Sequence, residues 1–153
     1  MYRTILAGFD GSEGAKMALK EAAEFGRLFR AKVTALWVQH ALPHFPETVG
    51  EIEEEKHAAT AFLSKITRDV AAIEKEMKYP IACKHQVGHP ASTLLKFAET
   101  GKYDLIVLGH SGHSRLWGRV LGHTADRVSE HADCNVLIIR RPIAANSKPK
   151  PSE

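Results

Sequence analysis

The sequence predicts a single-domain α/β fold, a five-stranded parallel sheet with helices on both faces. Three observations predict it. Segments with the apolar spacing of strands alternate with segments that have the spacing of helices, in the order β-α-β-α-β-α-β-α-β. Three of the strand segments are unbroken apolar runs, which is typical of strands that are buried on both faces of a parallel sheet. The length of 153 residues suits one domain.

The first strand is predicted over residues 4–9 and leads into the turn Asp10-Gly11-Ser12. Ser12 is expected to cap the following helix, and Glu13 places a favourable negative charge in its first turn. That helix runs to Phe29 with apolar residues at helical spacing. The second strand is predicted over residues 32–38.

A loop with two prolines is expected over residues 40–50, and a long helix over residues 51–77. Four glutamates load the first turns of this helix with negative charge, as a helix start prefers. Its apolar stripe is Ala59, Phe62, Leu63, Ile66, Val70, Ile73 and Met77. The third strand is predicted over residues 81–87.

The last third begins at Gly88-His89-Pro90, where Pro90 suits the first position of a helix. The fourth strand is predicted over residues 104–108, and a glycine-rich loop over residues 109–122. A short helix over residues 124–131 and a fifth strand, Asn135–Ile139, complete the alternation. The domain is therefore expected to span residues 1–141, followed by a flexible tail over residues 142–153, which contains three prolines and few apolar residues.

Composition excludes several classes of protein. The two cysteines, Cys83 and Cys134, are too few for a disulfide framework. They are expected to be small buried or half-buried side chains in a cytoplasmic, reduced protein. Every apolar run is far shorter than a membrane span requires, so no membrane association is expected.

The net charge of +3 has a definite location. Residues 1–108 hold 14 basic and 14 acidic side chains, so they sum to zero. The excess lies in Arg115 and Arg119 of the glycine-rich loop and in the tail. This distribution favours a small phosphorylated ligand over a nucleic acid, which would require a broad basic face.

The glycine-rich loop has the features of a phosphate site. Ligands of open parallel sheets bind beyond the carboxyl ends of the strands, where this loop lies. Gly109, Gly112 and Gly122 allow the backbone to approach a ligand, a helix starts just after Gly122, and Arg115 adds positive charge. Asp10, after the first strand, could accept a hydrogen bond from a ribose hydroxyl. The alternative is a flexible loop without a ligand and an aspartate that merely caps a turn.

Other sites find less support in the sequence. The P-loop pattern and the dinucleotide fingerprint are both absent, and no Ser-His-Asp arrangement is evident. His89, His110, His113 and His123 could bind zinc or copper, but solvated loop histidines explain them more simply. Trp37 could stack on a base, although packing is the favoured interpretation.

The sequence resembles the universal stress protein family over residues 2–140. The loop Gly109-x-x-Gly112-(nine residues)-Gly122 is similar to the family's G-x-x-G-x9-G-[S/T] signature. Four further segments look like those of the family: Ile5–Ser12, Gly88-His89-Pro90, Asp104–Gly109 and Cys134–Ile139.

The resemblance implies a Rossmann-like sheet in strand order 3-2-1-4-5 and a homodimer that pairs through the last strand. It implies a regulatory protein of the stress response that binds ATP, which Mg²⁺ could accompany. No carboxylate of the loop is placed to activate water, so at most weak ATPase activity is expected. The alternative is a dimeric interaction module whose loop binds an anion or a partner protein.

In the ATP-binding branch, the residues implied around the ligand are Asp10 near the ribose, Val38 near adenine, and Gly109, Gly112 and Gly122 around the phosphates. This sequence departs from the pattern after Gly122, where His123 stands in place of a serine or threonine and Thr124 follows it. An imidazole can donate one hydrogen bond to phosphate but is bulkier than a hydroxyl.

Overall fold

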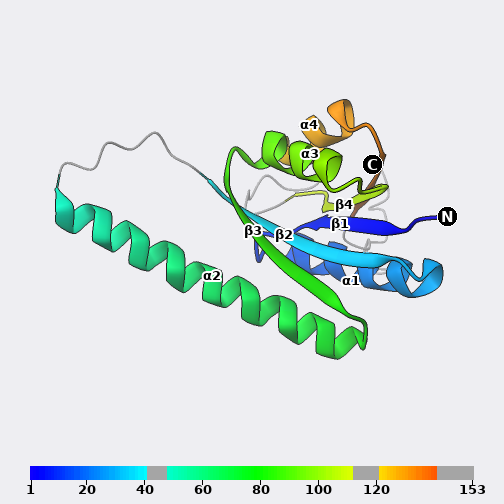
Figure 1. The fold of residues 1–153 in the computed structure, drawn as a ribbon, viewed down its shortest axis with the longest axis horizontal. Coiled ribbons are helices and arrows are strands. Elements are labelled where there is room, and N and C mark those ends of the chain that lie inside the picture. Colours follow the sequence, from blue (N-terminus) through cyan, green and yellow to red (C-terminus); the bar gives the residue numbers. More distant parts are fainter. Residues whose placement is uncertain (41–47, 112–120, 141–153) are drawn as a thin grey trace, which may run out of the picture.

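Five strands and four helices alternate along the chain in the computed structural model, which describes residues 1–40, 48–111 and 121–140 (Figure 1). The elements, in chain order, are β1 (Thr4–Gly8), α1 (Glu13–Phe29), β2 (Lys32–His40), α2 (Val49–Met77), β3 (Ile81–Gly88), α3 (Pro90–Thr100), β4 (Leu105–Gly109), α4 (His123–His131) and β5 (Asn135–Ile139). The predicted alternation is confirmed. Residues 142–153, expected to form a tail, lie outside the described residues.

The strands form one parallel sheet in the order β3-β2-β1-β4-β5, so the strand order implied by the resemblance is confirmed. Alternate side chains of the central strands enter two separate cores. Ile5, Ala7 and Val107 pack with α1 and α2 on one face. Leu6 and Ile106 pack with α3 and α4 on the other. The helices therefore cover both faces, as the apolar strands predicted.

Two sets of hydrogen bonds stabilise the side of the sheet where the strands begin. The carboxylate of Asp104 accepts hydrogen bonds from the backbone amides of Arg3, at 2.8 Å, and Thr4, at 3.1 Å. The hydroxyl of Tyr79 donates to the carbonyl oxygens of Gly26 and Ala31, where α1 ends and the chain turns into β2. Both contacts join residues far apart in the sequence, and they anchor the edge opposite the carboxyl ends of the strands.

Several boundaries differ from the sequence expectations. The strand β1 ends at Gly8, before Phe9, and β2 continues to His40 because it pairs with β3 from Val33 to His40. The helix α2 starts at Val49 because Thr48 caps it. The Thr48 side chain accepts from the Glu51 amide, and the Glu51 carboxylate accepts from the Thr48 amide. The expected helix start at Thr124 is one residue late, since α4 begins at His123.

The amino-terminal half of α2 projects beyond the sheet (Figure 1). Only Ile66, Val70 and Ile73 of its expected apolar stripe are buried, and all three lie in the second half of the helix. Phe62 and Leu63 are only partly covered. The periodicity predicted a helix correctly, but half of its length has no sheet beneath it. Among the described residues, no helix is both long and apolar enough to cross a membrane.

Candidate functional site

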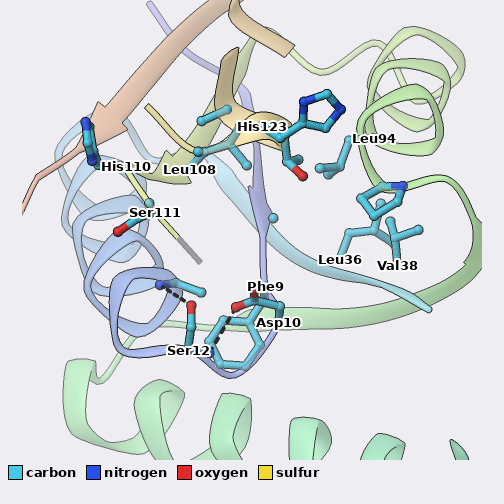
Figure 2. A pocket seen from close by; sticks show the side chains of 17 residues that line it. Phe9, Asp10, Ser12, Leu36, Val38, Leu94, Leu108, His110, Ser111 and His123 are labelled. Carbon is cyan, nitrogen blue, oxygen red and sulfur yellow. Dashed lines mark hydrogen bonds between the residues drawn. The ribbon is translucent and has the colours of Figure 1, made fainter. Parts of the chain in front are cut away.

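A cavity of about 320 Å³ lies beyond the carboxyl ends of β1, β2 and β4, beside the amino-terminal ends of α3 and α4 (Figure 2). The parallel order of the strands brings these ends together, which is where open α/β sheets bind ligands. Its lining residues are Gly8, Phe9, Asp10, Ser12, Ala15, Leu36, Val38, Pro90, Leu94, Leu108, Gly109, His110, Ser111, Gly122, His123, Thr124 and Ala125.

The wall made by β2, β4 and α3 is apolar. It consists of Leu36, Val38, Leu94, Leu108 and Pro90. Leu36, Leu94 and Leu108 are almost wholly buried in the core under α3 and α4, so this wall is fixed by packing. An apolar wall held in place from behind suits a flat, uncharged ring.

The turn after β1 supplies a carboxylate on another side of the cavity. Asp10 Oδ1 accepts a hydrogen bond from the backbone amide of Ser12 at 2.9 Å, and Ser12 Oγ accepts from the Ala15 amide at 3.2 Å. Gly11 between them has φ +80°, a backbone conformation that glycine adopts without strain. Asp10 therefore caps its turn, as the alternative interpretation without a ligand expected, and it also lines the cavity (Figure 2).

Glycines allow backbone segments to approach closely beside the cavity, at the start of α1 and the end of β4. A Cβ on Gly109 would lie 2.7 Å from the carbonyl carbon of Gly14 and 2.8 Å from its oxygen. A Cβ on Gly14 would lie 2.5 Å from the carbonyl oxygen of Ser111. The close approach of α1 to the end of β4 thus requires glycine at both positions.

The start of α4 is fixed over the end of β4. The Gly122 amide donates to the carbonyl oxygen of His110 at 2.7 Å, and a Cβ on Gly122 would lie 3.0 Å from that oxygen. Gly122 is the N-cap of α4 and provides no side-chain cap for the first amides of the helix. A helix start of this kind, beside a cavity, is a favourable place for an anion.

Six of the eight residues that the sequence predicts to bind the nucleotide line this one cavity. They are Asp10, Val38, Gly109, Gly122, His123 and Thr124. Their roles in binding stay predictions. Gly112 and Arg115 lie outside the described residues.

Sequence reasoning missed Ser12 and Ser111 as lining residues, and also the leucines of the apolar wall. Ser12 was assigned only to capping, although its place after β1 indicated that it faces the site. The leucines have the same pattern as any core residue, so no local signal distinguished them.

The histidines and Trp37 have distinct surroundings. His89 and His123 are exposed, as the solvated interpretation expected, whereas His110 is buried and contradicts it; His113 lies outside the described residues. The ring centroid of His89 lies 6.0 Å from that of His40, which is also exposed, and 6.4 Å from that of His123. Among the described residues, no group of three or more His, Cys, Asp or Glu side chains is arranged to hold a metal ion.

Trp37 is only 7% exposed and packs between Phe62 and His85, so the packing interpretation is confirmed.

Both cysteines are free and half-buried, as expected. Burial raises the pKa of the Cys83 thiol above its ordinary value, and a hydrogen bond with Thr67 partly offsets the effect. Burial also raises the pKa of Cys134, and the negative charges of Asp104 and Asp133 add to the increase. Neither thiol has the environment of a reactive cysteine.

Comparison with known proteins gives concordant results. Residues 1–140 match the model of the universal stress protein family. The universal stress protein MJ0531 of Methanocaldococcus jannaschii is 30% identical over 149 residues, which cover 93% of this chain and 84% of that protein.

Solved structures show the same fold. The universal stress protein UspA from Lactobacillus plantarum superposes with a TM-score of 0.80 at 31% identity, over 91% of this chain and 98% of that one. A universal stress protein in complex with cAMP superposes with a TM-score of 0.70 at 26% identity, over 90% of this chain and 97% of that one.

Proposed function

Since this chain belongs to the universal stress protein family, we propose that it is a regulatory protein of the stress response that binds an adenine nucleotide, with ATP as the expected ligand. The observation that carries the proposal is the cavity itself, which combines an apolar wall, a carboxylate and a glycine-bounded helix start. A relative of similar fold is known in complex with cAMP, an adenine nucleotide, and this supports the assignment.

The lining residues divide by chemistry into three parts. Leu36 and Val38 of β2 would cover one face of adenine, and Leu94 of α3 would cover the other face. Asp10 would accept a hydrogen bond from a ribose hydroxyl, because an ionised carboxylate only accepts. These parts account for the nucleoside.

The phosphates would lie at the start of α4. The backbone around Gly109 and Gly122 and the hydroxyl of Thr124 would hold them there, with Gly112 and Arg115 of the same loop sequence as further phosphate ligands. Mg²⁺ would accompany ATP by bridging phosphate oxygens.

We expect ATP hydrolysis to be absent or weak. Asp10 is the one carboxylate among the described lining residues, and its Oδ1 already accepts the Ser12 amide. A general base for hydrolysis must reach the attacking water. The arrangement therefore favours holding a nucleotide over cleaving it.

Isothermal titration calorimetry on nucleotide-stripped protein tests the proposal. ATP with Mg²⁺ should bind, and Asp10→Asn should weaken binding by about tenfold because it removes a charge-assisted hydrogen bond. Asp133→Asn is the matched control, since this exposed carboxylate follows the far end of α4 and should leave the affinity unchanged. Absence of binding by ATP, AMP and cAMP would overturn the proposal and favour the interaction-module alternative.

We further propose a homodimer that pairs through β5. This strand lies at the edge of the sheet, and Val136, Leu137, Ile138 and Ile139 are all partly exposed there. An apolar edge strand is a template for pairing with another chain. Light scattering should give the mass of a dimer. Ile138→Glu should reduce this mass toward that of a monomer. Val87→Glu is the control, because Val87 is exposed on β3, the opposite edge strand, and this variant should leave the mass unchanged.

Two lesser expectations accompany these proposals. The half-buried free cysteines suit a reducing compartment such as the cytoplasm. Residues 1–141 would form the family domain, with residues 142–153 as a tail, because the family match ends at residue 140.

A further inference from the structure

His110, the residue directly after β4, has a buried ring nitrogen that makes no hydrogen bond. The residue is only 9% exposed, and its Nε2 has no hydrogen-bond partner among the described residues. Ser12 and Thr34 are the other buried polar side chains that the structure describes. Both have partners, since Ser12 Oγ accepts from the Ala15 amide and Thr34 Oγ1 accepts from the Tyr103 hydroxyl. His110 is therefore the exception among them.

An unpartnered atom of this kind requires an explanation. A buried polar group that leaves water without gaining a partner destabilises the folded state, so such groups are rare in native proteins. Asp69 Oδ2 is the other such atom in the described part of the chain, but it belongs to a partly exposed side chain of α2 that does not line the cavity. The side chain of His110 does line the cavity (Figure 2), so a ligand bound there can supply the partner.

Backbone hydrogen bonds fix His110 where two strands and a helix meet. Its amide donates to the carbonyl oxygen of Ile139, at the end of β5, at 2.9 Å. Its carbonyl oxygen accepts from the amide of Gly122, the N-cap of α4, at 2.7 Å. His110 therefore lies directly beside the start of α4. Since both of its backbone groups are paired, the imidazole is the part that can contact a ligand.

The groups at the start of α4 are hydrogen-bond donors. The first amides of this helix belong to His123, Thr124 and Ala125, which all line the cavity, and no side chain caps them. The first amides of a helix have no acceptor within the helix, and its dipole gives them partial positive charge. A ligand that satisfies these amides and the His110 ring must carry several acceptor atoms close together. A phosphate group has this arrangement.

We propose that His110 binds phosphate, and that its Nε2–H donates a hydrogen bond to a phosphate oxygen of a nucleotide held at the start of α4. The inference rests on the proposed function and adds a side chain to its phosphate ligands. A neutral imidazole carries one N–H, and the bound phosphate selects the tautomer in which Nε2 carries it. Because the contact is to phosphate, His110 contributes to the affinity for ATP and not to the affinity for adenosine.

His110→Phe tests this contact, because it keeps a planar ring and removes both nitrogens. In calorimetry on nucleotide-stripped protein, the variant should bind ATP about tenfold more weakly, as the loss of one hydrogen bond to a charged group produces. Its affinity for adenosine should not change. His57→Phe is the matched control, since His57 is an exposed histidine on α2 and the variant should leave both affinities unchanged.

The same variant should have the opposite effect on the stability of the nucleotide-stripped protein. Replacing an unpartnered buried nitrogen by carbon removes the cost of its desolvation. Scanning calorimetry should therefore give His110→Phe a Tm about 2–4 °C above that of the native protein. The further increase in Tm at saturating ATP should be smaller for the variant. A residue with a merely structural role would not raise Tm and lower the affinity for ATP together.

Two amide variants identify the nitrogen that acts. The side-chain nitrogen of glutamine lies about where Nε2 lies in histidine, and that of asparagine lies about where Nδ1 lies. His110→Gln should therefore keep most of the affinity for ATP, whereas His110→Asn should lose about as much as His110→Phe. Equal affinities for ATP in the native protein and all three variants would overturn the role of His110.

Inorganic triphosphate separates this inference from the proposed function. If ATP and adenosine bind the native protein and His110→Phe equally, the nucleotide site stands and the phosphate contact is overturned. If triphosphate binds the native protein but not His110→Phe, while ATP and adenosine do not bind, the phosphate contact is supported and the proposed function is overturned. Absence of binding by all three probes would overturn both.

Discussion

Tyr79 illustrates how one side chain fixes the end of a helix. Its hydroxyl donates to the carbonyl oxygens of Gly26 and Ala31, and a Cβ on Gly26 would lie 2.7 Å from the Tyr79 ring. The ring therefore occupies the space beside Gly26 and its hydroxyl satisfies carbonyls at the end of α1. Such a contact helps to position α1, whose other end reaches the cavity at Ala15.

Tyr79→Phe should lower the free energy of unfolding by about 1–2 kcal/mol, because it leaves a part-buried carbonyl without its donor. Tyr2→Phe is the control, since the Tyr2 hydroxyl only accepts an exposed hydrogen bond from Asn135. Urea unfolding followed by circular dichroism measures both variants. A loss for Tyr2→Phe as large as that for Tyr79→Phe would contradict this account.

The two thiols should react slowly. Burial raises the pKa of both Cys83 and Cys134, so less thiolate is present near pH 8 than in a free cysteine. Their rates with a disulfide reagent should be below that of a cysteine in the urea-unfolded chain, and should rise steeply as the pH increases. A rate in the folded protein equal to that of the unfolded chain would show that the thiols are not protected.

At the scale of elements, α2 divides into two halves. The second half packs on the sheet through Ile66, Val70 and Ile73, whereas the first half extends past it (Figure 1). The capping box of Thr48 and Glu51 holds the free end, but a local cap contributes only about 1 kcal/mol. Tertiary packing provides most helical stability in proteins, so the two halves should differ.

Hydrogen exchange should reveal this difference. Amides of residues 53–63 should exchange much faster than those of residues 67–77, because opening the projecting half exposes little apolar surface. Mass spectrometry of peptides from the two halves measures the ratio, and Thr48→Ala should increase it further. Uniform protection along α2 would mean that another surface covers the first half in solution.

Local patterns predicted the elements well and the contacts between them poorly. The spacing of apolar residues identified the nine elements in the part of the chain that the structure describes, and Ser12 was correctly expected to cap α1. The hydrogen bonds of Asp104 with Arg3 and Thr4 span about a hundred residues and have no local signature. The strand order followed from a family resemblance, because many orders are compatible with one alternating sequence.

The same division holds for the candidate site. Glycines and the residues after each strand could be predicted to gather at one edge, since parallel strands place their carboxyl ends together. Neither the approach of His89 to His40 and His123 nor the apolar wall could be predicted. Both depend on which strands and helices become neighbours in space.

For the molecule as a whole, ligand binding should be linked to the stability of the entire sheet. The cavity is lined by residues from β1, β2, β4, α1, α3 and α4, so unfolding of the domain destroys it. A nucleotide at a hundredfold excess over its Kd should raise the free energy of unfolding by about 2.7 kcal/mol. Scanning calorimetry should show an increase in Tm of roughly 5–10 °C. An unchanged Tm at saturating nucleotide would contradict this linkage.

The projecting half of α2 also has a hydrodynamic consequence. A helix of 29 residues is about 43 Å long, whereas a compact chain of this size has a radius of gyration of about 15 Å. Small-angle scattering should therefore give a larger radius, and the protein should experience more friction than a sphere of equal mass. A monomer of this shape would leave a sizing column early, at a volume that a globular calibration assigns to a heavier particle. Measurements of assembly through β5 therefore depend on light scattering, which reports mass independently of shape.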